Sequence, residues 1–256
     1  MTTNGFNPEN SPIIQIERRK AIAIILAATI LALSFGFGLT KVGSGFAART
    51  TNGITVTGSA KTSATADNVV WTLNVSLTRP TVAAAVTKVG TDVIAVSKYL
   101  TDAGIPAGDI TLGSVSTYAN EEWQNGNSTG RILNYRANRD VVVRSTDVQL
   151  ISKLSQGIGS LLQTGVSVNN YGPQYYISTL PSLRPQLLEE AMKDAKVRAE
   201  ALTKAVGGNI GSLVNVKAGP IQITTPDSTM TADYGAYDTS TIEKTVTATV
   251  SVTFKS

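Results

Sequence analysis

The sequence predicts an α+β fold in which two strand-helix-strand-strand repeats, joined by a helix, form an antiparallel sheet with helices on one face. One transmembrane helix precedes this domain. Three observations lead to the prediction: residues 21–39 carry no charge, apolar and polar side chains alternate strictly at 69–77 and 246–254, and helical patterns separate the strands. Period-two alternation is typical of strands with one buried face, and antiparallel sheets commonly leave the other face in water.

The start of the chain predicts a membrane anchor. Residues 21–39 are mostly apolar and carry no charge, and at about 1.5 Å rise per residue a helix of this length nearly crosses a hydrocarbon core of about 30 Å. Arg18, Arg19 and Lys20 precede the segment. The positive-inside rule therefore predicts a cytoplasmic tail at residues 1–20 and an inner-membrane protein with a single span.

The rest of the chain is predicted to lie in the periplasm or outside the cell. Residues 40–52 form a linker, and residues 53–256 form one extracytoplasmic domain. The alternative is a signal peptide that is cleaved near residues 45–48, where small side chains gather. Cleavage would release the domain into the periplasm.

Strands follow from the alternation. Valine, tryptophan and leucine share one parity in residues 69–77, and valine, alanine and phenylalanine share one parity in 246–254. Branched side chains of this kind favour strands. Weaker alternation predicts further strands at 54–58, 109–118, 133–144, 166–178 and 212–224.

Three helices are predicted between these strands. Pro80 precedes the first, which ends before Gly104, and Asp147 is placed to cap the second. Ser182, ahead of Pro185, is the expected start of the third helix. The predicted ranges are 81–103, 147–163 and 182–206.

The third helix is expected to pack on the sheet through one stripe. Alanine recurs within the stripe, so the helix axis can approach the sheet closely. On the solvated side, Glu189 with Lys193 and Glu200 with Lys204 form pairs four residues apart in the favourable order. The predicted stripe is Leu188, Ala191, Met192, Ala195, Ala199, Leu202 and Val206.

Composition argues against several classes of function. The chain contains no cysteine and no histidine, which excludes a Cys₂His₂ zinc site, a thiol nucleophile and a Ser-His-Asp triad. The net charge of +4 comes without a concentrated basic surface, so no nucleic-acid partner is expected. We therefore predict a protein that is not an enzyme and has no cofactor, metal or catalytic residues.

Two groups of charged residues are candidate binding or catalytic sites. Arg131, Arg136, Arg139 and Arg144 suggest an anion site, but alternation along a strand places Arg136 and Arg144 on one face and Arg139 on the other. This favours solvated or paired arginines, with Asp140 as a partner. Similarly, the adjacent carboxylates in NEEWQNGNSTG suggest a solvated loop rather than a catalytic pair.

Two long polar segments occupy equivalent places in the two repeats. Each joins the last two strands of its repeat: 119–131 carries Trp123, and 225–241 carries Tyr234 and Tyr237. Hairpin loops usually need only about 2–5 residues, and aromatic side chains are enriched at interfaces. We predict that these three residues contact neighbouring copies; the alternative is plain solvated surface.

Several short motifs resemble the SIMPL-domain family. Ordered along the chain, they cover about residues 53–255. They are Ile54-Thr55-Val56-Thr57-Gly58, Gly104-Ile105 with Asp109-Ile110, Tyr135-Arg136-Ala137-Asn138 leading into Val141–Val143, and Ala191, Ala195 and Ala199 followed by Gly207-Gly208-Asn209-Ile210-Gly211.

This resemblance implies a bacterial periplasmic or envelope protein of the YggE-like or periplasmic immunogenic kind. It further implies a role in envelope or oxidative-stress defence and oligomers that can be ring- or channel-like. Family members commonly carry a cleaved signal, from which the long apolar segment at 21–39 departs. The resemblance carries no catalytic residues over to this chain.

The function predicted from sequence is a non-enzymatic, membrane-anchored envelope protein that acts as a homo-oligomer. Its partners are further copies of the chain and, through residues 21–39, the membrane. The alternative is a periplasmic protein that binds a small ligand, or an enzyme that uses tyrosine or carboxylate groups.

Overall fold

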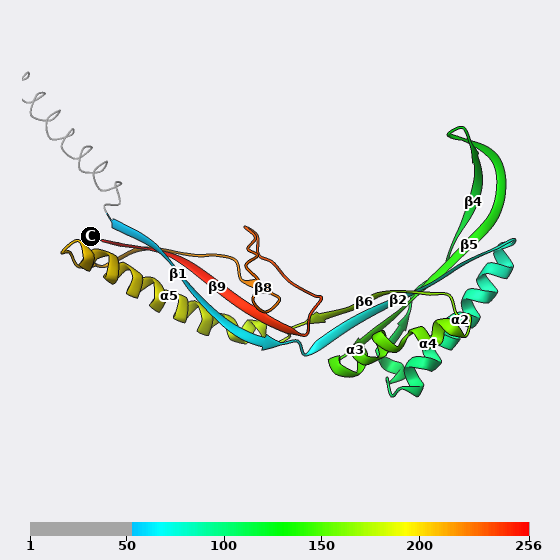
Figure 1. Cartoon of the computed structure of the whole chain (residues 1–256), viewed down its shortest axis with the longest axis horizontal. Coiled ribbons are helices and arrows are strands. Elements are labelled where there is room, and N and C mark those ends of the chain that lie inside the picture. Colours follow the sequence, from blue (N-terminus) through cyan, green and yellow to red (C-terminus); the bar gives the residue numbers. More distant parts are fainter. Residues whose placement is uncertain (1–52, 256) are drawn as a thin grey trace, which may run out of the picture.

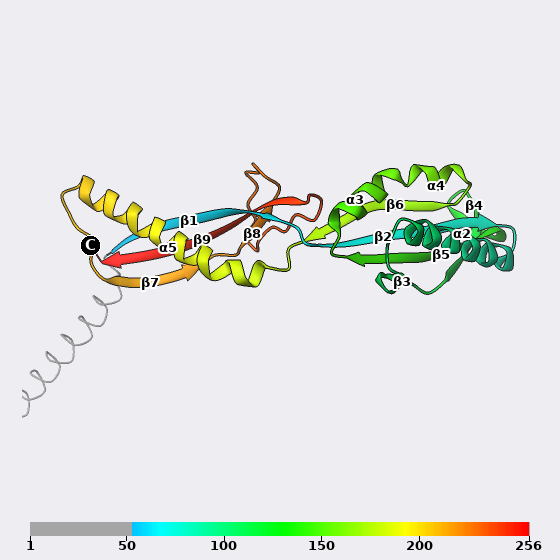
Figure 2. The same ribbon diagram turned by 90° about the horizontal axis from the view of Figure 1, so that it is seen from below.

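The structure of the protein is a computed structural model that describes residues 53–255. Its strands form two antiparallel sheets that lie end to end, and helices cover one side of each sheet (Figures 1 and 2). This confirms a mixed fold with antiparallel pairing. The predicted tail at 1–20, anchor at 21–39 and linker at 40–52 lie outside the described residues. Within residues 53–255, no helix combines the length and apolar character needed to cross a membrane.

We call the first sheet the β2 sheet, because β2 lies at its centre. β2 pairs with β5 on one side and with β6 on the other, while β3 and β4 both pair with β5. Helices α2 and α3 contact this sheet, and a short 3-10 helix, η2, precedes β3. The elements are β2 (Asn68–Arg79), α2 (Val82–Asp102), η2 (Ala107–Asp109), β3 (Ile110–Leu112), β4 (Ser116–Gln124), β5 (Asn127–Ser145), α3 (Val148–Gly157), α4 (Gly159–Gln163) and β6 (Val168–Tyr176).

The core of the β2 sheet follows the predicted parity. Val69, Trp71, Leu73, Val75 and Leu77 are all buried, as alternation requires. Burial of such side chains removes apolar area from water and stabilises the fold.

Helix boundaries in this half agree with the sequence in part. Thr81 caps α2 by accepting a hydrogen bond from the N–H of Ala84, and Asp147 caps α3 by accepting one from Leu150 N at 2.9 Å. The predicted helix at 147–163 is interrupted at Ile158, between two glycines. Glycine lowers helix propensity, which explains why the chain divides into α3 and α4 here.

The second sheet, here the β9 sheet, is built around β9. β1 pairs along the whole of one edge of β9, and β7 and β8 pair in succession along the other. Helix α5 covers one face (Figure 1). The predicted apolar parity of residues 246–254 is buried on that face. The elements are β1 (Gly53–Thr65), α5 (Leu180–Ala205), β7 (Leu213–Ala218), β8 (Gln222–Thr224) and β9 (Glu243–Lys255).

Helix α5 lies very close to β1. A Cβ atom on Gly58 would come within 2.1 Å of the carbonyl oxygen of Ala191, so only glycine fits at this crossing. Asp194 also accepts a hydrogen bond from the N–H of Ser59 at 2.8 Å. The alanine stripe therefore serves close packing, as predicted. The residues of α5 that are buried are Leu187, Ala191, Ala195, Ala199 and Thr203.

Three details of α5 differ from the prediction. Leu202 and Val206 are exposed, because the buried line runs through Thr203 and Val206 lies beyond the last helical residue. The helix begins after Thr179 rather than at Ser182. Among its ion pairs, Lys193 binds Glu189 at 2.6 Å as expected, but Glu200 pairs with Lys196 at 3.7 Å and not with Lys204.

The pairing between repeats is also different from the prediction of one sheet built from two successive repeats. β6, expected to open the second repeat, pairs with β2, and β1 completes the β9 sheet. Only Ala66 and Asp67 separate β1 from β2, yet these strands enter different sheets. Local alternation shows which face of a strand is buried but does not specify its partner.

Candidate functional site

A two-stranded arm projects from the β2 sheet on the side opposite its helices (Figure 1). The last pair between β2 and β5 joins Arg79 to Tyr135, so no third strand within residues 53–255 pairs with residues 119–134 of β4 and β5. Asn125 and Gly126 close the hairpin with φ of 51° and 82°, as the mirror-image turns of hairpins require. The predicted long loop at 119–131 is therefore wrong: these residues form strands around a tight Asn-Gly turn.

Large apolar side chains are exposed on the arm. Trp123 is 67% exposed, Ile132 45% and Leu133 50%. An isolated two-stranded hairpin is only marginally stable in water, and exposed apolar surface of this kind often marks an interaction site. The arm thus presents one of the two predicted sets of contact residues to solvent.

The two glutamates of the arm accept hydrogen bonds from other residues of the arm. Glu121 accepts a hydrogen bond from the Ser128 hydroxyl, and Glu122 accepts one from the Thr129 hydroxyl at 3.1 Å. Asp140 accepts a hydrogen bond at 2.6 Å from the side-chain amide of Asn74. These three carboxylates thus bind polar groups of their own or neighbouring strands.

The equivalent segment of the β9 sheet, residues 225–241, folds back on the sheet. Ile223 N donates to the carbonyl of Ala236 at 2.8 Å, and Asp238 N donates to the carbonyl of Ile223 at 2.8 Å. The buried side chain of Gln222 bonds the backbone of Ala232 through both its oxygen and its nitrogen, and accepts a further hydrogen bond from Ala236 N at 2.7 Å. These hydrogen bonds attach the segment to β8, and we call it the folded loop.

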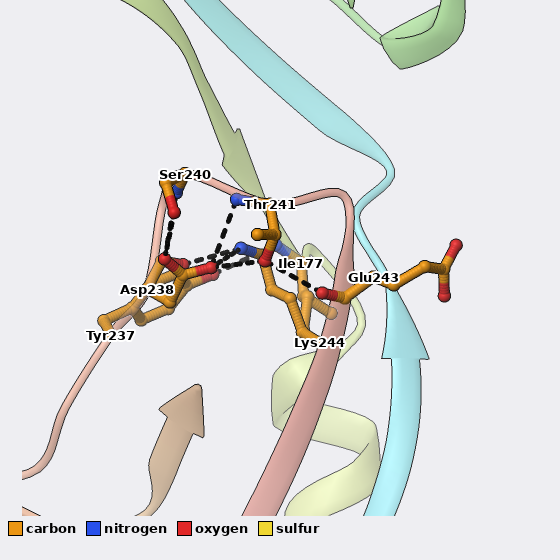
Figure 3. A network of polar contacts seen from close by, with 7 residues as sticks. All are labelled: Ile177, Tyr237, Asp238, Ser240, Thr241, Glu243 and Lys244. Atoms are coloured by element: carbon orange, nitrogen blue, oxygen red, sulfur yellow. Dashed lines mark hydrogen bonds and ion pairs between the residues drawn. The ribbon is translucent and has the colours of Figure 1, made fainter. Parts of the chain in front are cut away.

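The end of the folded loop carries a buried ion pair (Figure 3). The side chain of Lys244 is 0% exposed, and its ammonium group donates to the carboxylate of Asp238 at 3.1 Å and to the same residue's carbonyl at 2.6 Å. Ser240 and Thr241 also donate hydroxyl hydrogen bonds to this carboxylate, each at 2.6 Å. Partial burial acts to raise the pKa of Asp238, but hydrogen bonds from Ser240, Thr241 and Lys244 outweigh it and hold the pKa well below its ordinary range.

The three predicted contact residues do not come together. Trp123 lies on the arm, whereas Tyr234 and Tyr237 lie in the folded loop of the other sheet. Tyr234 is fully exposed, but the hydroxyl of Tyr237 accepts a hydrogen bond from Ile177 N at 3.0 Å (Figure 3). Its ring also contacts Tyr176, with ring centroids 5.9 Å apart. Tyr237 therefore has an internal role as well.

A cavity of about 520 Å³ lies between the first turns of α5 and the folded loop. Its walls are mostly apolar, and Arg184 is the one charged residue among those that line it. The sequence prediction missed Arg184, although it is the only charged residue between Leu180 and Leu188. The lining includes Leu180, Leu188, Pro220, Ile221, Tyr234 and Tyr237.

Two further observations concern possible cofactors and relatives. Among residues 53–255, no three acidic side chains are grouped so that they could hold a metal ion, and the absence of cofactors stays a prediction.

The family model SIMPL, described as "Protein of unknown function (DUF541)", matches residues 54–254. A search of curated proteins gave no match.

Proposed function

We propose that this chain, which belongs to the SIMPL family, is a non-enzymatic, membrane-anchored envelope protein that acts through homo-oligomeric assembly. A ring- or channel-like assembly and a role in envelope or oxidative-stress defence, both implied by the family resemblance, are part of this proposal. The observation that carries it is the arm with its exposed Trp123.

The arm has the properties of an assembly element. It exposes a tryptophan and two aliphatic side chains on strands that have a free edge, and a free edge can pair with another chain. Tryptophan is enriched among the residues that dominate binding energy at protein interfaces. Contact with a second copy would remove these side chains from water, which favours association.

The position of the arm also fits a protein held at a membrane. Gly53 pairs with Lys255, so both ends of the described chain lie at one end of the β9 sheet. The arm is at the opposite end of the elongated molecule (Figures 1 and 2). An anchor at 21–39, joined through the linker at 40–52, would leave the arm far from its attachment and able to reach neighbours.

Photo-crosslinking tests the assembly. The chain has no cysteine, so Ser128→Cys gives a single attachment point for a benzophenone maleimide in the full-length protein. Ser128 is exposed and lies directly opposite Trp123 in the hairpin, so Trp123 itself is kept. We expect crosslinked dimers and larger species on illumination. Glu200→Cys is the matched control, because this side chain is 51% exposed on the solvent side of α5. Equal crosslinking at the two positions, or none at 128, contradicts assembly through the arm.

Protease protection tests the anchor. We expect protease added to spheroplasts to digest the domain at 53–256 while a tail at 1–20 stays protected inside. A fully protected domain contradicts the proposed topology. A mature chain that begins near residues 45–48 supports the alternative of a cleaved signal.

The cavity beside Arg184 favours a second candidate function, binding of a small ligand. Cavities of about 300–1,000 Å³ with apolar walls and a few polar groups are typical of ligand sites. An apolar molecule with one acidic group would match this lining. The probe 8-anilinonaphthalene-1-sulfonate has that chemistry; we expect saturable fluorescence that is lost in Arg184→Gln and kept in Trp123→Ser. Equal fluorescence in wild type and Arg184→Gln contradicts this candidate.

A further inference from the structure

A second cavity, of about 490 Å³, lies where β6 diverges from β2. The two strands pair as far as Val75 and Val168, after which Ser76 N donates to the carbonyl of Ser167 at 3.3 Å. Beyond Ser76, β2 has no strand on this side among the described residues. The cavity occupies that open edge, and polar side chains form most of its wall.

Three cationic side chains from three elements line this cavity. Arg79 comes from the end of β2, Lys88 from α2 and Arg136 from β5. Asp92 is the one carboxylate in the lining, which leaves a surplus of two positive charges. The sequence placed Arg136 on one face with Arg144, and the structure joins it to basic residues that are distant along the chain.

An ion pair and a hydrogen bond hold two of these cations, Lys88 and Arg136, at the cavity wall. The carboxylate of Asp92 is 2% exposed; it binds the Lys88 ammonium group and accepts a hydrogen bond from Ser167 N at 3.3 Å. The Nε of Arg136 donates to the hydroxyl of Ser76 at 2.8 Å. Since Nε is used in this way, the two terminal nitrogens of the guanidinium are directed to other acceptors. Asp92 and Ser76 thus position Lys88 and Arg136 at the cavity wall, whereas Arg79 is exposed and donates to the carbonyl of Thr78 at 2.8 Å.

The backbone adds a further donor. Backbone N–H groups of alternate residues along a strand point to the same side. The N–H of Ser76 points toward β6, so the N–H of Thr78 points to the same side, at the open edge. Guanidinium groups and backbone N–H groups are the donors that proteins use to bind phosphate. Two surplus positive charges match the charge of a phosphate dianion.

From this geometry we propose that the cavity at the open edge of β2 binds the phosphate group of a small molecule. Arg79, Lys88 and Arg136 supply the charge, and Thr78 N supplies a neutral donor. Asp92 is a positioning residue, because it holds Lys88 at the cavity wall. Asn120 of the arm also lines the cavity, but the groups that would bind phosphate, and Asp92, all lie outside residues 119–134, so the inference does not rest on assembly through the arm.

Isothermal titration calorimetry of the full-length protein at low ionic strength tests this site. The probes are inorganic phosphate and glycerol 3-phosphate, and the tighter ligand identifies free phosphate or a phosphate monoester as the source. We expect saturable binding at one site per chain. Arg79 is exposed, so Arg79→Gln should leave the fold intact. The affinity of this variant for the tighter probe should fall at least about tenfold, because a hydrogen bond between charged groups contributes a factor of about ten to affinity.

Two further variants complete the test. Arg136→Gln should weaken binding by a similar factor, whereas Arg144→Gln, on the same strand but outside the cavity, should leave affinity unchanged. Thermal unfolding of each variant shows that the fold is intact. Absence of saturable binding by both probes overturns the proposal, as does wild-type affinity in a folded Arg79→Gln protein.

Discussion

The arm and the folded loop occupy equivalent places in the two halves of the chain but have opposite structures. Residues 119–134 form a ladder with two register shifts, closed by Asn125 and Gly126, and Trp123 remains in solvent. Residues 225–241 form almost no ladder, yet Gln222 binds their backbone and Asp238 binds Lys244 of β9, which attaches them to the sheet. A polar segment with aromatic residues can thus form either a projecting hairpin or a loop that packs on its own sheet.

The difference lies in where the hydrogen bonds go. In the arm, the inward backbone groups pair with the opposite strand of the same hairpin, and the outward groups and the side chains stay available for a partner. In the folded loop, buried side chains satisfy the backbone, and the loop becomes part of the fold. We therefore expect changes in the folded loop to affect stability, and changes in the arm to affect association.

The largest expected effect is at Asp238. In Asp238→Asn, Lys244 remains buried without its carboxylate, and loss of one partner of a buried ion pair costs about 3 kcal/mol or more. Chemical denaturation of the domain at 53–256 measures this change. Asp233→Asn is the control, because Asp233 is exposed in the same loop; it should cost less than about 0.5 kcal/mol. Equal costs would mean that the pair does not stabilise the loop.

The same variant makes a prediction about pH. The pKa of Asp238 is lower in the folded protein than its ordinary value of 3.8, so the unfolded state takes up the proton first as pH falls. The contribution of the Asp238 carboxylate to the free energy of unfolding is complete at pH values well above 3.8, and it is lost as the pH drops toward the pKa of Asp238 in the folded protein. The stability difference between wild type and Asp238→Asn should be constant near neutral pH and shrink below about pH 4. A difference that grows in acid contradicts this assignment.

A smaller effect is expected at Gln222. Gln222→Ala leaves the N–H of Ala236 and the backbone of Ala232 without their partner, at a cost of about 2 kcal/mol. The loop should also become sensitive to limited proteolysis between residues 225 and 235. Gln124→Ala, next to the turn of the arm, is the control, and cleavage at the same rate in both variants would show that Gln222 does not hold the loop.

Tyr237 is expected to contribute less. Tyr237→Phe keeps the ring against Tyr176 and removes only the acceptor for Ile177 N, so we expect a loss of about 1 kcal/mol in thermal unfolding. Tyr234→Phe should have no measurable effect, because Tyr234 is fully exposed. A larger loss at 234 than at 237 would reverse the assignment of the internal tyrosine.

The smallest effect on stability is expected at Trp123. Trp123→Ser should change the free energy of unfolding of the isolated domain at 53–256 by less than about 0.5 kcal/mol, because the side chain is exposed and packs little within its own chain. Urea denaturation at low protein concentration gives this value. A loss above about 2 kcal/mol would mean that the tryptophan belongs to the core.

Much of this fold was accessible from the sequence, because local patterns determine local structure. Alternation identified the buried faces at 69–77 and 246–254, and Asp147 was recognised as a cap. Pairing partners were not accessible, because β1 and β6 carry no local signal for the sheet that they join. The arm could have been found, since Asn125-Gly126 is a strong hairpin signal.

The candidate sites were less accessible than the fold. Trp123 and Tyr234 were identified as exposed aromatic residues, but nothing local shows that Tyr237 bonds Ile177, which is distant in the chain. The phosphate site depends on Arg79, Lys88 and Arg136, which only the tertiary fold brings to one cavity. Sequence reasoning groups residues along an element, whereas this site combines three elements.

The most direct test of assembly through the arm is the mass of the native particle. The full-length chain, of 26.8 kDa, would be extracted in detergent and measured by native mass spectrometry beside Trp123→Ser. We expect a single defined multimer for wild type and a smaller particle for the variant, with unchanged thermal unfolding of the domain. A monomeric wild type, or a Trp123→Ser particle of the wild-type mass, would contradict the proposal.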